Sequence, residues 1–226
     1  MTSLSNTSLE KIIPYQYFEN GGVTDWMPEL LKKGYDPMGA NVIIDRRQNA
    51  PEEVRSEYNF FFWTADSCVT TQEGGVLLTL DSSVLRELTP KSQLVDGGLK
   101  LGREAWDKLV ADKEHTLYLT PQELETVHGK GYVLKNGKFI PANKAVAKAW
   151  EHLNRGRDLQ NYAQMVSEAS KSNNIMQLYF DRPKPGTDYR QEYKPRAFIL
   201  RSLVIDHLFL SSLILADRND SLSRKL

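Results

Sequence analysis

Four histidines and one cysteine are the side chains of this sequence best suited to act as metal ligands, general bases or nucleophiles. The histidines are His115, His128, His152 and His207, and neighbouring ones lie at least 13 positions apart. This spacing excludes a local metal-binding pair, but it leaves open a pair that the fold assembles. Cys68 lies in an apolar, aromatic stretch, which favours a buried structural thiol over a nucleophile.

Two stretches repeat the order acid, histidine, apolar run and hydroxyl residue: "EHTLYLT" around His115 and "DHLFLSS" around His207. The order resembles the motifs of two-histidine phosphoesterases, whose histidines act as acid and base on a phosphodiester. That family needs a hydroxyl residue two positions after each histidine, where Leu117 and Phe209 stand here. Phosphate-loop, dinucleotide-binding, zinc-protease and serine-hydrolase motifs are also absent from the sequence.

Residues 56–81, "SEYNFFFWTADSCVTTQEGGVLLTLD", predict two core strands joined by a polar turn. Phe60, Phe61 and Phe62 are typical of a central strand that is covered on both faces. Trp63 stands where this strand becomes polar, and its indole N–H needs a hydrogen-bond acceptor. Trp63 is therefore a candidate for the wall of a ligand cleft as well as for the core.

The order "YQYF", "DWMPELLKKGYDP", "YNFFFWTADS" and "GGVLLTLD" resembles the N-terminal half of the ADP-ribosyltransferase-like fold over residues 12–81. Carried onto this sequence, the resemblance places Tyr17 near the first nicotinamide-site motif. It places Trp63, Thr64 and Ser67 near the second motif. The resemblance implies that these residues bind NAD as a substrate and that aromatic rings stack on its nicotinamide.

The third motif of that family places a glutamate just before a strand, and "YRQEYKPRAFIL" offers Glu192. The resemblance implies that Glu192 is catalytic: its carboxylate holds a ribose hydroxyl and stabilises the positive charge that develops as nicotinamide leaves. The alternative for Glu192 is a solvated loop charge. The function implied is an ADP-ribosyltransferase-like protein that binds NAD and transfers ADP-ribose to an unknown acceptor.

A basic segment offers a second function of another class. Residues 130–157 contain seven bases and one acid, Glu151, although the 29 basic and 29 acidic residues of the whole chain balance. The bases are Lys130, Lys135, Lys138, Lys144, Lys148, Arg155 and Arg157. Such a surface attracts phosphate-rich or other anionic partners. The alternative is therefore a non-catalytic interaction protein that binds an anionic partner through this segment.

The chain of 226 residues has the composition of a folded domain, 26% charged and 40% hydrophobic. We expect an α+β fold with a mixed or antiparallel central sheet and inserted helices. Residues 1–10 are expected to be flexible and residues 11–226 to form a single domain. Helical spacing is clear from residue 141 to 171. Residues 197–217 fit either a buried helix or two buried strands, and "ANVIID" (40–45) predicts a strand.

The cellular location is predicted from two segments. The N-terminus has neither the basic start nor the apolar core of a secretory signal, so we expect a soluble, cytoplasmic protein. Arg201, Asp206 and His207 interrupt the most apolar stretch, which argues against a membrane span. No membrane partner and no metal are expected.

Overall fold

Seven helices and ten strands fall in the part of the chain that the computed structural model describes, residues 22–49, 62–71, 73–95, 98–180, 196–205 and 207–213. The strands are β1 (Phe62–Thr70), β2 (Val76–Thr79), β3 (Leu94–Val95), β4 (Gly98–Lys100), β5 (Thr116–Leu119), β6 (Lys130–Lys135), β7 (Lys138–Pro141), β8 (Asn174–Tyr179), β9 (Arg196–Ile205) and β10 (His207–Leu213). The helices are α2 (Val23–Lys32), α3 (Ala40–Asn49), α5 (Ser83–Arg86), α6 (Arg103–Ala111), α7 (Pro121–Val127), α8 (Lys144–Leu153) and α9 (Gln160–Ser170).

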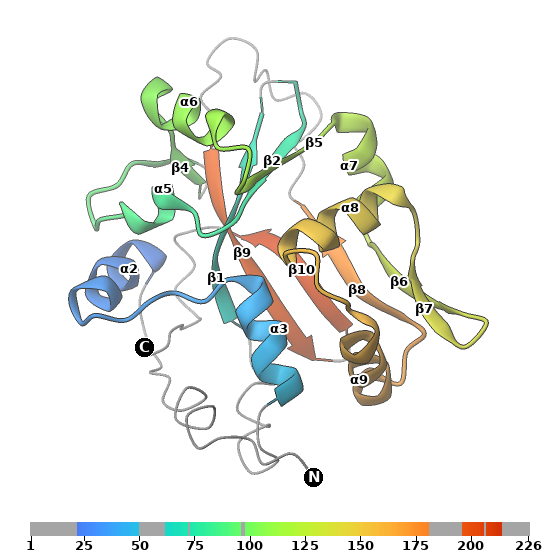
Figure 1. The fold of residues 1–226 in the computed structure, drawn as a ribbon. Coiled ribbons are helices and arrows are strands. Elements are labelled where there is room, and N and C mark those ends of the chain that lie inside the picture. Colours follow the sequence, from blue (N-terminus) through green and yellow to red (C-terminus); the bar gives the residue numbers. More distant parts are fainter. Residues whose placement is uncertain are drawn as a thin grey trace.

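All ten strands join one sheet, whose main path is β5-β2-β1-β9-β10-β8-β6-β7 (Figure 1). The pair β8–β10 is parallel and the other described pairs are antiparallel, so the sheet is mixed. This arrangement confirms the predicted α+β class. The boundaries at residues 10 and 11 stay a prediction, because both residues lie outside the described ranges.

Where residues 56–81 are described, they form two paired strands, as predicted; Phe60 and Phe61 lie outside the described residues. β1 and β2 are antiparallel, with Cys68 opposite Leu78, and both side chains are completely buried. β1 also pairs with β9, which places it inside the sheet rather than at an edge. The expectation of a buried thiol at Cys68 is therefore confirmed.

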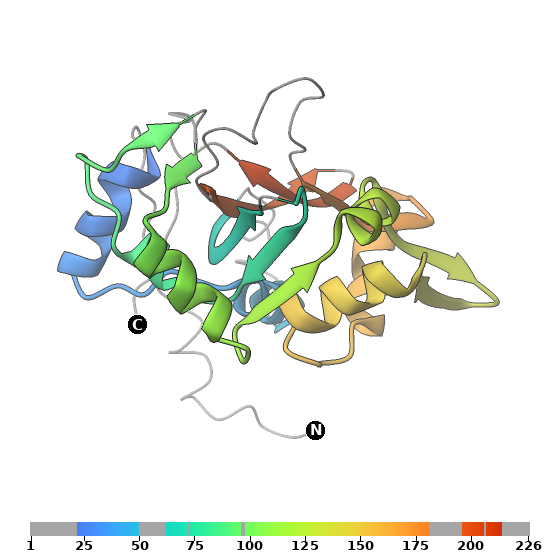
Figure 2. The same cartoon turned by 90° about the horizontal axis from the view of Figure 1, so that it is seen from above.

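Helices α8 and α9 cover one face of the sheet, as the view from above shows (Figure 2). Their buried residues form one large core cluster with strands β2, β5, β6 and β8, and Trp150 and Tyr162 are fully buried in it. The indole N–H of Trp150 donates to the carbonyl of Met176 at 2.8 Å. The helical spacing predicted for residues 141–171 is thus confirmed as two helices, separated by a turn at Arg155 and Gly156 with positive φ.

The prediction for residues 40–45 is wrong, because they begin helix α3. Val42, Ile43 and Ile44 favour a strand locally, since branched side chains fit a pleated surface. The helix is held by residues far away in the sequence. The carboxylate of Asp66 accepts a hydrogen bond from the N–H of Ala40, at 2.6 Å. A local pattern does not report such a contact.

The open question for residues 197–217 is decided in favour of strands where the chain is described. β9 and β10 are antiparallel neighbours, and they lie between β1 and β8 in the middle of the sheet. Long apolar runs without alternation are typical of strands that are buried on both faces. Within the described ranges, no helix combines the length and apolar character that crossing a membrane requires.

The outer edge of the sheet at β7 is closed by a side chain. The amide of Gln160 accepts from the N–H of Phe139 at 3.2 Å and donates to the same residue's carbonyl at 2.5 Å. Pro141, the next residue on that side, has no N–H. Gln160 therefore replaces the neighbouring strand that this edge lacks, which prevents edge-to-edge association.

Replacing Gln160 with leucine is expected to lower the free energy of unfolding by about 1–3 kcal/mol, because it leaves two backbone groups of Phe139 without partners. Urea unfolding measures this change, and light scattering should show increased self-association. The matched control is Gln164→Leu on the same helix, whose amide bonds only the exposed Glu168. An equal loss of stability in both variants would contradict the role given to Gln160.

Candidate ligand-binding pocket

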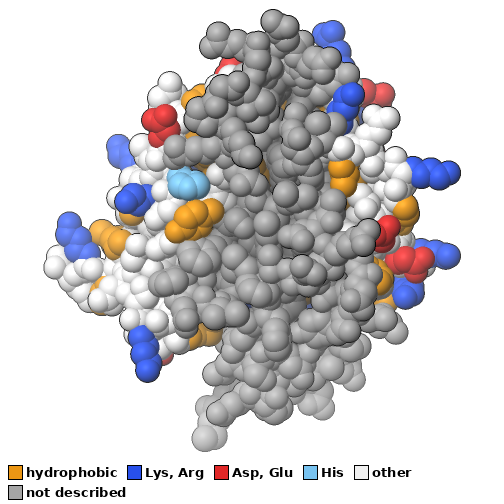
Figure 3. All heavy atoms as spheres, turned by 180° about the vertical axis from the view of Figure 1, so that it is seen from behind, with side chains coloured by type: hydrophobic (Ala, Val, Ile, Leu, Met, Phe, Trp, Pro, Cys, Tyr) orange, Lys and Arg blue, Asp and Glu red, His pale blue; other side chains and the backbone are white. Residues whose placement is uncertain are grey.

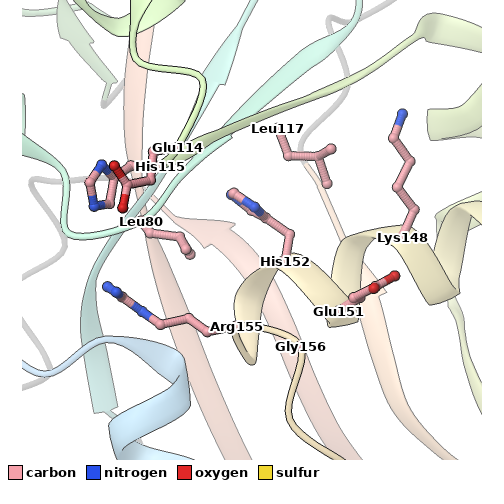
Figure 4. Close-up of a pocket in the computed structure, with 9 residues that line it drawn as sticks. All are labelled: Leu80, Glu114, His115, Leu117, Lys148, Glu151, His152, Arg155 and Gly156. Carbon is pink, nitrogen blue, oxygen red and sulfur yellow. The ribbon is translucent and has the colours of Figure 1, made fainter.

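A cavity of about 480 Å³ lies between the C-terminal half of α8 and the strand ends near β5 (Figure 4). Its walls combine two leucines with ionisable side chains of both signs. The lining residues are Leu80, Glu114, His115, Leu117, Lys148, Glu151, His152, Arg155 and Gly156. The volume falls in the range of small-molecule sites.

Helix α8 presents its polar stripe to the pocket. The side chain of Asn143 caps the helix by accepting from the N–H of Val146 at 2.9 Å. The apolar stripe of the helix, which includes Trp150, is buried against the sheet. Positions 148, 151 and 152 are spaced i, i+3 and i+4, so they share one face of the helix. Arg155 follows the C-cap residue Asn154 and has a φ of 52°, so the turn after the helix brings it to the same cavity.

The opposite wall comes from the start of β5. The carbonyl of His115 accepts from the N–H of Leu80 at 2.8 Å, which ties this wall to the end of β2. The ring of His115 is engaged elsewhere, since its Nδ1 lies 3.1 Å from both carboxylate oxygens of Asp112. Figure 4 shows this ring pointing in a different direction from the ring of His152. The fold thus brings two distant histidines to one cavity without making them a catalytic pair.

His152 is a fixed part of the pocket floor. Its Nε2 lies 3.1 Å from the carbonyl oxygen of Leu78, and its side chain is half-buried. Burial lowers the pKa of His152, although hydrogen bonds to the backbone of Leu78 and His115 act in the opposite direction. The ring is therefore neutral at pH 7, and its Nε2–H is directed at the carbonyl of Leu78.

The ammonium group of Lys148 is also engaged. It donates to the carbonyl of Tyr118 and to the carboxylate of Glu123, both at 2.9 Å. Tyr118 belongs to β5, the other outer strand of the main sheet path, so Lys148 covers an edge as Gln160 does at β7. Lys148 thus lines the cavity with its charge already paired with that of Glu123.

The charged side chains that stay available to a ligand lie at the rim of the pocket. Arg155, Glu114 and Glu151 are exposed, and among the described residues none of the three has an ion-pair partner. The lining contains no hydroxyl or thiol side chain that could act as a nucleophile. Within the described ranges, no three histidine, cysteine or acidic side chains are grouped to hold a metal ion.

Asp66 is the most strongly perturbed acid of the described chain, and the sequence analysis did not single it out. Desolvation by complete burial raises its pKa to about 6. Hydrogen bonds from the N–H groups of Ala40 and Asp81 and the positive charge of Arg155 act in the opposite direction, but burial outweighs them. The acid stands inside a strand of apolar and small residues, a signal that was available in the sequence. Its two hydrogen bonds connect Ala40, at the start of α3, and Asp81 to strand β1.

The residues implied by the ADP-ribosyltransferase resemblance do not line this cavity where they are described. The hydroxyl of Thr64 is buried and bonds the backbone of Asp66. Ser67 is also fully buried, with its Oγ 2.8 Å from the Oγ of Ser82. The backbone of Trp63 lies on β1 opposite Arg201, but its side chain is outside the described part. Tyr17 and Glu192 lie outside the described residues altogether.

A comparison with solved structures identifies the fold. One structure, reported as "Accommodation of massive sequence variation in Nanoarchaeota by the C-type lectin fold", matches 93% of this chain and 94% of its own, with a TM-score of 0.60 and 12% identity. This chain has the C-type lectin fold. No protein-family model matches the sequence, and no curated protein matches it.

The fold assignment corrects the sequence-based function. The C-type lectin fold replaces the ADP-ribosyltransferase-like fold that the order of segments in residues 12–81 suggested. That resemblance rested on strand and helix order, which different α+β folds share. ADP-ribose transfer from NAD, with Glu192 as its catalytic residue, depended on the resemblance and is therefore not carried forward.

The basic segment does not form one continuous array of available charges. Lys148 pairs with Glu123, and Arg157 lies 3.9 Å from the carboxylate of Asp45. Arg155 belongs to the rim of the pocket. The remaining four bases are exposed, and among the described residues they have no ion-pair partner; they are Lys130, Lys135, Lys138 and Lys144. Binding of an anionic partner stays a prediction and concerns these four.

Proposed function

We propose that this protein is a non-catalytic binding protein that takes a small ligand in the pocket between α8 and β5. The observation that carries the proposal is the exposed side chain of Arg155 at the rim of the cavity. The polar groups of His152 and Lys148, which also line the cavity, already have hydrogen-bond partners within the protein. His152 and Lys148 are held by the protein itself, so they shape the cavity without reacting.

The chemistry of the rim indicates the kind of ligand. A guanidinium presents a fork of donors that suits a carboxylate or phosphate. The carboxylates of Glu114 and Glu151 accept hydrogen bonds from hydroxyl or amino groups. Leu80 and Leu117 offer apolar contact between the charged groups. A small ligand with one acidic group and several hydroxyl groups, such as an acidic sugar, meets all these features.

The similar structure supports a role for the fold as a scaffold, since it is described as accommodating massive sequence variation. We propose that the fold is a scaffold in this chain as well. The rim residues Arg155, Glu114 and Glu151 are exposed and form no ion pair among the described residues, so we expect the fold to tolerate changes there. Specificity then resides in the rim and stability in the buried residues beneath it.

Replacing Arg155 with glutamine is expected to weaken binding of glucuronate by about tenfold, a typical effect of losing a charge-assisted hydrogen-bond pair. Chemical-shift titration measures the dissociation constant, and glucose, which lacks the carboxylate, should bind about tenfold more weakly than glucuronate to the unaltered protein. The matched control is Arg103→Gln on α6, whose side chain is 94% exposed and, among the described residues, forms an ion pair with Asp107 alone.

The proposal fails if glucuronate causes no shifts at the pocket. It also fails if Arg155→Gln and Arg103→Gln bind glucuronate equally well, or if glucose binds as tightly as glucuronate.

A further inference from the structure

The hairpin formed by β6 and β7 projects beyond the helices that cover the sheet (Figure 1). Its turn is Asn136-Gly137, and both residues have positive φ, as a tight two-residue hairpin turn requires. Lys135 and Lys138 flank the turn directly opposite each other. In Figure 3 this projection stands at the left edge and carries lysine side chains with hydrophobic ones beside them.

The hairpin carries exposed aliphatic groups as well as charge. Within the described part of the chain, Leu134 and Ile140 are the large hydrophobic side chains that are exposed, at 42% and 38%. Leu134 is opposite Phe139 and Ile140 is opposite Val133, so the two side chains lie on opposite faces of the ribbon. A partner that contacts the hairpin therefore meets aliphatic groups as well as charge.

The charges of Lys135 and Lys138 also affect the stability of the hairpin. Like charges directly opposite each other on paired strands repel and destabilise the pair. Neither Lys135 nor Lys138 has an ion pair among the described residues, and Lys130 at the start of β6 adds a third exposed ammonium. A bound carboxylate between the two opposite lysines removes this repulsion.

The partner does not add a strand to the sheet at this place. Gln160 occupies the outward N–H and carbonyl of Phe139, and Pro141 offers no N–H. Binding through the hairpin therefore uses side chains and not the backbone.

We propose that the β6–β7 hairpin docks an acidic segment of another protein, in which carboxylates flank an apolar side chain. A membrane is a poorer fit, because insertion needs apolar groups outermost and the lysines stand beyond Leu134 and Ile140. A nucleic acid is also a poorer fit, because the exposed apolar groups are aliphatic and offer no aromatic surface for base stacking. Acidic and aliphatic groups on the partner complement what the hairpin presents.

The test is selection of peptides from a random phage-displayed library on the intact protein, with counter-selection on the double variant Lys135→Glu/Lys138→Glu. Enriched peptides are expected to combine Asp or Glu with an aliphatic or aromatic residue. Synthetic copies should bind the double variant and, separately, Ile140→Thr about tenfold more weakly, and binding should weaken steeply with salt. The charge-matched control is Lys91→Glu/Lys113→Glu, two exposed lysines outside the hairpin.

Three outcomes overturn the proposal. The first is a selection that yields no peptide discriminating against the double variant, and the second is a set of enriched peptides without acidic residues. The third is tighter binding of duplex DNA, or of vesicles of phosphatidylserine and phosphatidylcholine, than of the peptides, with this binding lost in the double variant. The partner is then a nucleic acid or a membrane. Melting temperatures of all variants are measured alongside, and equal values show that the losses concern binding. The hairpin and the pocket are separate surfaces, so either proposal can fail without the other.

Discussion

Gly131→Ala is expected to lower the free energy of unfolding by more than about 3 kcal/mol, since the added methyl group meets backbone rather than a movable side chain. A Cβ at Gly131 would lie 2.6 Å from both the carbonyl carbon and the carbonyl oxygen of Met176, and it would overlap the carbonyl oxygen of Ile175. The strand pair β6–β8 shifts its register at this point, and Met176 has positive φ.

Relief of this clash has further costs inside the core. The carbonyl of Met176 accepts the indole N–H of Trp150, so moving the strand breaks a buried hydrogen bond. The matched control is Gly102→Ala, where no atom lies within 4 Å of the new Cβ and φ is −72°. There the expected loss is about 1 kcal/mol, because alanine is a poorer N-cap residue than glycine. Urea unfolding measures the free energy of unfolding of both variants. Equal losses would show that the backbone of β8 does not approach Gly131 as closely as described.

The second large effect is a pH dependence carried by Asp66. Its pKa is raised from 3.8 to about 6 in the folded state, mainly by burial. Between these values the folded state holds a proton that the unfolded state has lost, so protonation stabilises the fold as the pH falls. This contribution is fully present below about pH 4 and is lost as the pH rises through about 6. It changes the free energy of unfolding by about 2 kcal/mol between pH 4 and pH 7.

Asp66→Asn isolates this contribution, because an amide does not titrate. Urea unfolding of the protein and the variant at about pH 4 and pH 7 gives the difference in stability at each pH, and subtraction removes the other acids. The free energy of unfolding of the protein minus that of the variant should be about 2 kcal/mol larger at pH 4 than at pH 7. A pH-independent difference would show that the folded-state pKa of Asp66 is not raised. An opposite sign would show that its hydrogen bonds outweigh its burial.

Much of the secondary structure was predictable because its determinants are local. Asn136-Gly137 between alternating residues predicts the hairpin, and positive φ at both positions is its physical cause. Thr120 followed by Pro121 predicts the start of α7, where the Thr120 side chain accepts from the N–H of Glu123. These signals concern residues within a few positions of each other.

The site was less predictable because its parts come from distant segments. His115 and His152 meet at one cavity only because α8 packs against the edge at β5. The sequence analysis left open a pair of histidines brought together by the fold. It gave no reason to choose these two from four, and no signal that both rings would be engaged by other groups.

Local sequence signals were enough to predict the α+β class, the buried thiol, the strand pair β1–β2 and the helical spacing after residue 141, because periodicity and turn residues act over short distances. Tertiary structure decided that residues 40–45 form a helix, since a buried carboxylate from β1 holds its first N–H group. It also decided that residues 197–205 and 207–213 form central strands and that the fold is the C-type lectin fold. Such choices depend on contacts between segments that are far apart in the chain, and free energy gained there overrides local preference.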